Sequence, residues 1–397
     1  MFKHLRILAL AALVLLTGCG EKSAPSEAPA NFSVTPGDSQ VVLHFTQEPG
    51  MTYWLFYAPA TGINRDNYLS YTGAQLIRDV YDGGAIAGLA NGQIYSFFMN
   101  ASNGSGPAGP TTATISVTPR PAGGSWVANP IIGNGANANA VTFGLSHFVT
   151  VTTGGGIYYS DDGQNWTASD NAGTSANLNG VTLGSNATVM VAVGDAGTLL
   201  SSTDALTWTP HASGTSANLN SVAAFGGTYI AVGEGGTILY STDGTTWSAR
   251  TSPVMENLRK VVYVRDDFVA VGDNGTVLTS PDGNAWTKQN SGTGATLYDV
   301  AYGNNTFVGV GAAGTLMTSP DLVTWTPLAL DPSITLYAAT FGSQFIAVGQ
   351  NGTTLVSPDG VSWNFVASAT SADLYAIVFG SGTYLAVGQN GASQYSN

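Results

Sequence analysis

The last two thirds of the chain alternate short apolar runs with polar turns, and the order of runs repeats about every 39 residues. Each repeat opens with an apolar strand, followed by a turn, a second apolar strand and a Gly-rich hairpin. A third strand, an Asp-containing turn and a fourth strand that starts at a tryptophan complete it. Four short strands in about 40 residues are typical of one propeller blade. The seven opening strands are residues 140–143, 178–183, 219–225, 258–264, 297–302, 336–341 and 374–379.

Two landmarks fix the period of this array. Repeats of such length are single supersecondary units stacked around an axis or along a line. The first landmark is tryptophan, at Trp126, Trp166, Trp208, Trp247, Trp286, Trp325 and Trp363, with spacings of 40, 42, 39, 39, 39 and 38 residues. The second is the glycine that ends the second strand in the last six repeats, at Gly194, Gly233, Gly272, Gly311, Gly349 and Gly388.

The two ends of the array complement each other. The seventh repeat stops at Asn397 before its fourth strand, whereas the array begins with an isolated fourth strand at 125–127. Pairing the two closes a ring and leaves no exposed strand edge. An open solenoid needs polar caps, and neither end has one. We therefore predict a seven-bladed β-propeller over residues 125–397, closed by the strand of Trp126.

Residues 31–119 show strands with period-two alternation, at 32–34, 41–45, 53–57, 94–101 and 112–117. The segment from Gly88 to Pro107 resembles the second half of a fibronectin type III domain, and the resemblance extends over about residues 29–119. It implies a β-sandwich in which Tyr95 is the corner tyrosine. Phe45 stands where the family usually has a core tryptophan. Such modules serve mostly as spacers and adhesive surfaces. Residues 120–124 are a linker. The predicted fold class is thus all-β, a fibronectin type III-like sandwich followed by the propeller.

The chain begins with an export signal over residues 1–18. Lys3 and Arg6 precede an apolar run too short to span a bilayer as a permanent helix. The following residues, Leu-Thr-Gly and Cys19, resemble the lipobox of bacterial lipoproteins. The resemblance implies an acylated Cys19 at the mature N-terminus, a tether over 19–30 and, since Gly20 follows, the outer membrane. The alternative is an ordinary signal peptide with an incidental cysteine.

Composition excludes some partners. The chain has 24 acidic and 11 basic residues, a net charge of −13, and removal of the leader makes it more acidic. Nucleic acid and anionic lipid headgroups bind basic clusters, so neither is expected as a partner. Cys19 is the only cysteine, so no disulfide forms within the chain. With 44% hydrophobic residues the chain can fill a core.

Six of the repeats share the turn Ser-x-Asp followed four residues later by Trp. It resembles the Asp box of sialidases and of propellers such as photosystem II assembly factors. An Asp carboxylate accepts backbone N–H groups within its own turn, so we predict a structural role. Ala205 and Leu322 replace the usual glycine in two copies. The six aspartates are Asp162, Asp204, Asp243, Asp282, Asp321 and Asp359.

The hairpin between strands two and three is predicted to share one face with the crossovers that join the blades, where propellers usually bind ligands. Asp195, Glu234 and Asp273 occupy equivalent hairpin positions in three consecutive blades. They form either a carboxylate arc for a cation or basic partner, or ordinary solvated turn acids.

All basic residues of the array fall within residues 250–288. These five residues form a candidate contact for a carboxylate-bearing partner: Arg250, Arg259, Lys260, Arg265 and Lys288. The alternative is local pairing with Glu256, Asp266 and Asp267.

The predicted function is a lipid-anchored, non-catalytic envelope protein whose propeller binds protein or glycan. The arginine triad that the sialidase resemblance requires cannot be assembled, because the array has three arginines in two neighbouring repeats. The alternative is a glycoside hydrolase or lyase acting on a polysaccharide, for which Asp195, Glu234 and Asp273 are the candidate carboxylates. His147 and His211 lack metal-ligand spacing, so no metal or cofactor is expected.

Overall fold

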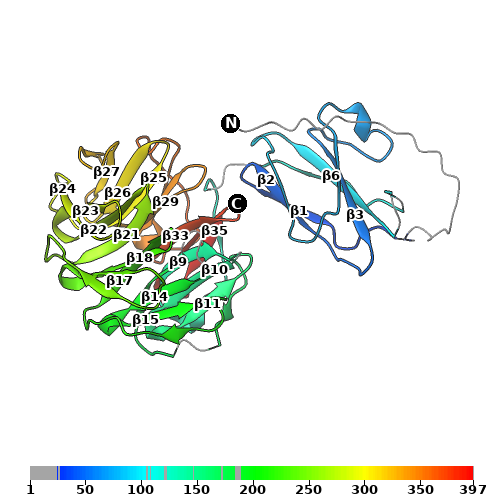
Figure 1. The fold of residues 1–397 in the computed structure, drawn as a ribbon. Helices are drawn as coiled ribbons and strands as arrows, with labels where there is room; N and C mark the ends of the chain where they lie inside the picture. The colour runs from blue at the N-terminus through cyan, green and yellow to red at the C-terminus, as the bar shows by residue number, and fades with distance from the viewer. Residues whose placement is uncertain are drawn as a thin grey trace. The chain divides into compact units, whose positions relative to one another are not determined.

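The computed structural model describes residues 25, 27–103, 106–107, 109–119, 123–145, 147–170, 173–183 and 189–396. The chain forms two compact units, one that ends at Thr118 and one made mainly of residues 119–397 (Figure 1). The predicted leader and Cys19 lie outside the described residues. Within the described ranges, no helix has the length and apolar character needed to cross a membrane.

The N-terminal unit is a sandwich of two sheets with strand orders β1-β2-β5 and β4-β3-β6-β7. Alternate residues of β2 are buried, as the period-two pattern requires. Leu43 of one sheet and Leu55 and Phe97 of the other are fully buried in a single core. The strands are β1 (Ser33–Gly37), β2 (Gln40–His44), β3 (Thr52–Ala58), β4 (Gln75–Arg78), β5 (Ala85–Ala87), β6 (Tyr95–Ser102) and β7 (Ile115–Val117).

Two strands of this unit were not predicted from the sequence. β4 has no buried residue and β5 has one, so neither shows the apolar alternation that marks a strand. A short 3-10 helix, η1 (Tyr68–Ser70), lies in the same stretch of the chain. The hydroxyl of Tyr95, at the start of β6, accepts the backbone N–H of Ala90 at 3.1 Å. This bond ties β6 back to the loop that leads into it.

The C-terminal unit consists of seven four-stranded antiparallel sheets, which we call blades 1 to 7. The first strands of consecutive blades contact one another around the whole circle, including β33 of blade 7 with β9 of blade 1. Blades 1 to 3 are β9 (Ala138–Gly144), β10 (His147–Thr152), β11 (Ile157–Ser160) and β12 (Thr167–Ala168); β13 (Leu178–Leu183), β14 (Met190–Gly194), β15 (Leu199–Ser202) and β16 (Thr209–Pro210); β17 (Leu219–Phe225), β18 (Thr228–Gly233), β19 (Ile238–Ser241) and β20 (Ser248–Arg250). Blades 4 to 6 are β21 (Leu258–Val264), β22 (Asp267–Gly272), β23 (Thr276–Ser280) and β24 (Thr287–Asn290); β25 (Leu297–Gly303), β26 (Thr306–Gly311), β27 (Leu316–Ser319) and β28 (Thr326–Pro327); β29 (Leu336–Phe341), β30 (Phe345–Gly349), β31 (Thr354–Ser357) and β32 (Asn364–Phe365).

Blade 7 is completed by a strand from the start of the unit. It contains β33 (Leu374–Gly380), β34 (Thr383–Gly388), β35 (Ser393–Ser396) and β8 (Val127–Ala128). β8 runs antiparallel to β35, with Val127 opposite Tyr395 and Ala128 opposite Gln394. The predicted fold class is confirmed: the chain is all-β, with a sandwich and a seven-bladed propeller closed by its N-terminal strand.

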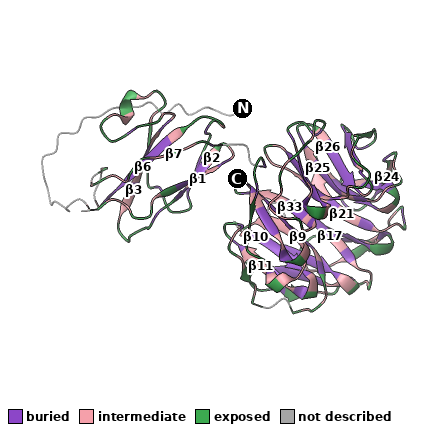
Figure 2. Ribbon diagram, turned by 180° about the vertical axis from the view of Figure 1, so that it is seen from behind, coloured by how far each residue is buried: buried purple, intermediate pink, exposed green. Residues whose placement is uncertain are grey.

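The second strand of each blade is the most buried part of the propeller. Every residue of β14 and β30 is buried, and in the other blades only the first residue of this strand is partly exposed. Figure 2 shows these middle strands in the buried colour. A strand covered on both faces has no polar side, so its sequence is a continuous apolar run.

The glycine that ends the second strand in blades 2 to 7 is required by close packing. A Cβ on Gly194 would lie 2.1 Å from the carbonyl oxygen of Asn177, and Gly233 and Gly272 show the same 2.1 Å approach to the preceding crossover. The backbone of Gly194 is extended, with φ of −165°, so its conformation alone does not demand glycine. The Val-Gly landmark therefore marks where each hairpin rests on the segment that enters its own blade.

Candidate functional site

The two ends of the propeller carry different turns. The hairpin between strands two and three lies against the segment that enters the same blade, since the N–H of Asp195 donates to the carbonyl of Asn177 at 2.9 Å and the bond recurs in other blades. We call this end the crossover face. Because consecutive strands are antiparallel, the Ser-x-Asp turns between strands three and four lie at the opposite end.

The six Ser-x-Asp turns share a hydrogen-bond pattern. In blade 3, Asp243 Oδ1 accepts the N–H groups of Thr245 and Thr246, both at 2.7 Å, and the hydroxyl of Ser241 at 3.0 Å. Ser241 Oγ in turn accepts the N–H of Gly244 at 2.9 Å. Two backbone N–H groups are likewise accepted by Asp162, Asp204, Asp321 and Asp359, and one, from Asn284, by Asp282.

These bonds stabilise the ionised carboxylates. The N–H groups of Ser362 and Val361 lower the pKa of Asp359 to about 2. Burial opposes ionisation of Asp162, but hydrogen bonds from its own turn outweigh it and the pKa is lowered. The carboxylates accept hydrogen bonds from their own turns, and this is a structural role. Backbone hydrogen bonds also lower the pKa of Asp204, Asp243, Asp282 and Asp321.

The two turns without glycine keep the glycine conformation. Ala205 has φ of 64° and Leu322 has φ of 66°, both in the left-handed region. Both side chains are buried in the cores between blades. Burial of the side chain offsets the strained backbone at these positions.

The three hairpin acids begin the short helices η4 (Asp195–Gly197), η5 (Glu234–Gly236) and η6 (Asp273–Gly275). Each accepts the side-chain amide of the asparagine that enters its own blade. The distances are 2.8 Å from Asn177 to Asp195, 3.2 Å from Asn218 to Glu234 and 3.0 Å from Asn257 to Asp273.

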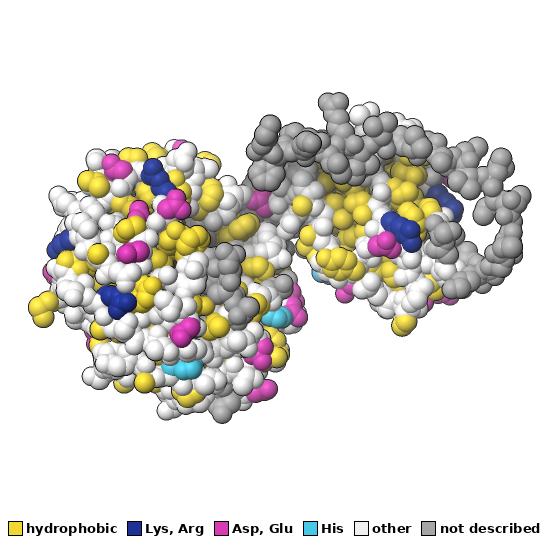
Figure 3. All heavy atoms as spheres, in the orientation of Figure 1, with side chains coloured by type: hydrophobic (Ala, Val, Ile, Leu, Met, Phe, Trp, Pro, Cys, Tyr) yellow, Lys and Arg dark blue, Asp and Glu magenta, His cyan; other side chains and the backbone are white. Residues whose placement is uncertain are grey.

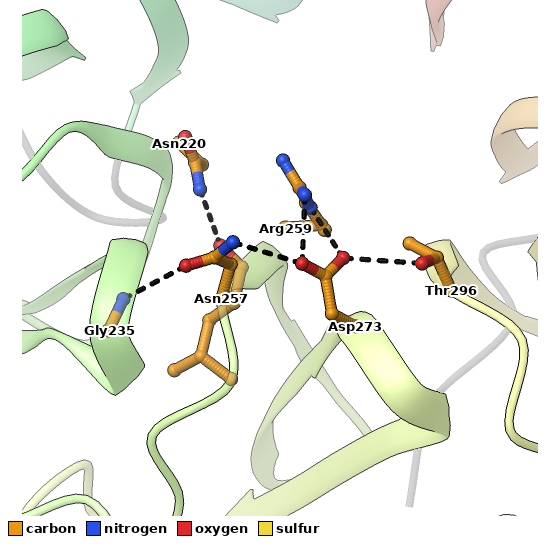
Figure 4. A network of polar contacts seen from close by, with 7 residues as sticks. Asn220, Gly235, Asn257, Arg259, Asp273 and Thr296 are labelled. Atoms are coloured by element: carbon orange, nitrogen blue, oxygen red, sulfur yellow. Dashed lines mark hydrogen bonds and ion pairs between the residues drawn. The ribbon is translucent and has the colours of Figure 1, made fainter.

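The same asparagines connect neighbouring blades. The amide oxygen of Asn257 accepts the N–H of Gly235 in the preceding hairpin at 3.0 Å (Figure 4). Asn218 does the same for Ala196 at 2.8 Å. The acids therefore orient amides that hold adjacent blades together, which neither sequence interpretation anticipated. No group of three or more His, Cys, Asp or Glu in the described chain could hold a metal ion.

Four of the five basic residues lie on three different strands of blades 3 and 4. Arg259 and Lys260 lie on β21, whereas Lys288 lies on β24, at the other edge of the same sheet. Arg250 ends β20, and its guanidinium lies 4.2 Å from the ring centroid of Tyr240. On the face seen in Figure 3, Lys and Arg of the propeller appear as separate spots, one of them beside acidic side chains.

The first strands place seven side chains, one from each blade, around the mouth of the axis at the crossover face. Each is the second residue of its strand, directly after the buried residue that opens it. All seven are partly exposed and line a single cavity of about 270 Å³. We call this set the axial ring. Its members, in blade order, are Asn139, Asn179, Asn220, Arg259, Tyr298, Tyr337 and Tyr375.

Asparagines make up one side of the axial ring. The Nδ2 of Asn139 donates to the carbonyl of Leu178 at 2.8 Å, and Asn220 donates to Leu258 at the same distance. Asn179 donates to the carbonyl of Leu219, at 3.1 Å, and to Asp195. Both N–H groups of Asn179 have acceptors, whereas Asn139 and Asn220 each keep a second N–H beside the amide oxygen. No described residue donates to these three oxygens.

Arg259 separates the asparagines from the tyrosines. Its Nε and Nη2 donate to the two carboxylate oxygens of Asp273, each at 2.8 Å. Burial opposes ionisation of Asp273, but Arg259 outweighs it and the pKa of the carboxyl is lowered. The outer nitrogen of Arg259 and the amide oxygen of Asn220 point to the same side, away from Asp273 (Figure 4).

Tyrosines make up the remaining side. The ring centroids of Tyr298 and Tyr337 lie 5.4 Å apart, and those of Tyr337 and Tyr375 lie 5.6 Å apart, both edge-to-face. Burial, and secondly the charge of Asp373, raises the pKa of Tyr337 and Tyr375. Their hydroxyls therefore remain protonated at neutral pH.

The residue after Arg259, Lys260, forms an ion pair with a buried carboxylate. Lys260 Nζ lies 3.8 Å from Asp299, whose carboxylate accepts the N–H groups of Val300 and Ala339 at 2.8 and 3.1 Å. Burial raises the pKa of Asp299 against the attraction of Lys260. Lys260 also lines a second cavity, of about 300 Å³, together with Tyr263 and other residues of blades 4 to 7.

The side chains at the axial ring bear on the catalytic alternative. Its seven members include no carboxylate, histidine, serine or cysteine, whereas Ser221 and Lys260 also line the cavity. The candidate carboxylates begin hairpins of neighbouring blades 2 to 4, and none of them lines this cavity. His147 pairs with Asp161 of a Ser-x-Asp turn, and His211 bonds Ser201 at 2.7 Å on the outer part of blade 2.

The fold and the axial ring define a β-propeller protein with a polar and aromatic axial mouth. Residues 257–374 match the profile of the DUF6242 beta propeller domain. A search of curated proteins found no match to the chain.

Solved structures with similar folds include YCF48 bound to D1 peptide, with a TM-score of 0.57 and 19% identity over 70% of this chain and 94% of that one. YCF48 from Cyanidioschyzon merolae has a TM-score of 0.56 and 16% identity over 68% and 98%. A catalytically inactive histidine-to-alanine virginiamycin B lyase from Staphylococcus aureus with quinupristin has a TM-score of 0.63 and 11% identity over 69% and 99%. At these identities the similarity is one of fold.

Most of the axial ring was missed from the sequence, where only Arg259 was singled out. The signal is present, because a buried leucine precedes the ring residue in six opening strands, as in Leu178–Asn179 and Leu336–Tyr337. Comparing that one position across the seven repeats would have found the ring.

Proposed function

We propose that the protein is a non-catalytic binding protein of the cell envelope, anchored by lipid at Cys19, which holds a protein partner at the axial ring. The observation that carries the proposal is the composition of this ring. It offers amide oxygens, an arginine and three tyrosines around a cavity. Interfaces are enriched in tyrosine and arginine.

The size of the cavity favours a protein partner over a free small molecule. About 270 Å³ is below the range of typical small-molecule pockets but accommodates one side chain. Exposed apolar side chains on two crossovers, Ile131 and Met255, supply further contact area on the crossover face. A propeller of similar fold has been solved with a bound peptide, YCF48 with D1 peptide, which supports the same mode here.

The N-terminal sandwich acts in this proposal as a fibronectin type III-like spacer between the lipid and the propeller. Its strand orders, β1-β2-β5 and β4-β3-β6-β7, and the bond from Ala90 to Tyr95 support that assignment. The spacer places the propeller away from the lipid without contributing to partner binding.

Site-specific crosslinking tests the proposal. The photoreactive residue p-benzoylphenylalanine replaces Tyr337 in the full chain, and a matched chain carries it at the exposed Phe365 on β32. After irradiation of intact cells, position 337 should yield a defined protein adduct that Tyr298→Ala weakens. Equal adducts at both positions, or an adduct with polysaccharide only, would overturn the proposal.

Cys19→Ser tests the anchor separately. The substitution should release the protein from membranes or leave it unprocessed, as measured by fractionation and by the mass of the mature chain. A mutant that is still membrane-bound and normally matured would contradict lipidation at Cys19.

A further inference from the structure

We propose that the axial ring receives a cationic side chain, arginine or lysine, from the protein partner. The inference rests on the proposed function and specifies the chemistry of its ligand. Three independent features of the axial ring point to a cation: its free acceptors, its aromatic faces and the charge around it.

The free acceptors are the amide oxygens of Asn139, Asn179 and Asn220. Hydrogen bonds to the next blade hold each nitrogen, so the oxygens present an arc of acceptors on three consecutive blades. Guanidinium and ammonium groups bring several N–H donors and no acceptor. A ligand rich in acceptors, such as a carboxylate, would meet these oxygens without a partner.

The aromatic faces belong to Tyr298, Tyr337 and Tyr375 on the other side of the cavity. Because the three rings lie edge-to-face, they are inclined to one another and do not form a flat platform. Inclined rings around a cavity suit a cation, which gains from the negative face of each ring within about 6 Å.

The charge around the mouth is negative. Arg259 is the cation of the ring, and its bidentate bond to Asp273 compensates it. Asp195 is bonded to Asn179 of the ring, and Asp373 and Glu234 act electrostatically on Tyr375 and Arg259. Lys260 lines the same cavity and is paired with Asp299. Acids therefore exceed bases at the rim, and the chain as a whole carries −13, so the field attracts cations.

Blocked peptides test the inference directly. The probes are acetylated and amidated Gly-Gly-Arg-Gly-Gly, its lysine analogue, and the same peptide with citrulline, a neutral isostere of arginine. Calorimetric titration of the full chain in detergent should show the arginine peptide binding about tenfold more tightly than the citrulline peptide. Added salt should lower the affinity for the arginine peptide and leave the affinity for the citrulline peptide unchanged.

Two substitutions that remove opposite charges give the sharpest result. Glu234→Gln keeps an oxygen that can accept the side-chain amide of Asn218 and removes a negative charge. It should therefore weaken binding of the arginine peptide severalfold. Arg259→Gln removes a positive charge from the ring and should therefore strengthen binding of the arginine peptide. A carboxylate-binding site would respond to Arg259→Gln in the opposite direction. Melting curves show whether each variant is folded.

Aromatic variants separate the ring face from the hydroxyl. Tyr337→Ala should lower the affinity for the arginine peptide about tenfold. Tyr337→Phe should bind this peptide nearly as tightly as the wild type does. Phe365→Ala is the matched control on an outer strand. Equal binding of the arginine and citrulline peptides, or tighter binding of maltohexaose than of either, overturns the cationic ligand. The proposed function falls separately, if crosslinking at position 337 captures no protein.

Discussion

Closure of the propeller can be tested by replacing the tryptophan of the closing strand. Trp126 is 9% exposed and packs in one core with Ile346 of blade 6 and Ala386 of blade 7, although it precedes a strand of only two residues. Its Nε1 has no hydrogen-bond partner among the described residues, so Trp126→Ala removes packing alone. Truncation of a buried tryptophan costs about 3–5 kcal/mol in the free energy of unfolding.

Trp286 provides a matched reference inside blade 4. It is also 9% exposed, and its Nε1 donates to the carbonyl of Gly283 at 3.1 Å. Trp286→Ala should therefore cost the same packing energy plus about 1 kcal/mol for the hydrogen bond. If β8 closes the ring, Trp126→Ala destabilises the whole propeller to nearly the same extent.

Calorimetric melts of the full chain measure the difference. Tryptophan fluorescence assigns the propeller transition, because Trp54 is the one tryptophan outside the array. For a domain of this size about 1 kcal/mol shifts the midpoint by about 2–4 °C, so Trp126→Ala should lower it by about 6–20 °C. The ring-closure argument is refuted if the free energy of unfolding of Trp126→Ala lies within about 0.5 kcal/mol of the wild-type value while Trp286→Ala lowers it by several kcal/mol.

Two further predictions concern the turns. Asp359→Ala should lower the free energy of unfolding by about 1 kcal/mol without changing partner binding, because its carboxylate accepts two N–H groups of its turn. Its folded pKa of about 2 lies below the ordinary 3.8, so the ionised group stabilises the fold above about pH 4. That contribution is lost as the pH falls toward 2, and acid titration of Asp359→Asn beside the wild type should show a smaller loss. Ala196→Gly and Ala313→Gly, at exposed positions with φ of 52° and 53°, should each stabilise the protein by about 0.5–1 kcal/mol. Ala249→Gly, in the extended strand β20, should destabilise it in the same melts, and the reverse order would contradict the backbone argument.

Repetition made the propeller predictable from the sequence. The buried opening leucines, such as Leu219 and Leu297, and the glycines at the ends of second strands recur at one period. Each blade places them in the same environment, so seven copies of a weak pattern combine into a strong one. The strands of the sandwich were harder to predict from the sequence, because β4 and β5 expose most of their side chains and are paired through backbone atoms.

The hairpin acids show where the sequence was ambiguous. Asp195, Glu234 and Asp273 fitted either a carboxylate arc or solvated turn acids. Their partners are asparagines 16 to 18 residues earlier in the chain, and no spacing rule marks such pairs. Likewise, the basic residues are close in sequence, but Arg259 and Lys288 lie on opposite edges of blade 4.

The sequence by itself determined the number of blades, the strands within each and the strand that closes the ring. These follow from local apolar patterns and from their period, which are written along the chain. The axial ring was decided by the tertiary structure, because its seven members lie about 40 residues apart and meet only when β8 completes blade 7 and β33 contacts β9. A closed circle brings one position of every repeat to a common mouth, so residues that look unremarkable in each repeat become a site together.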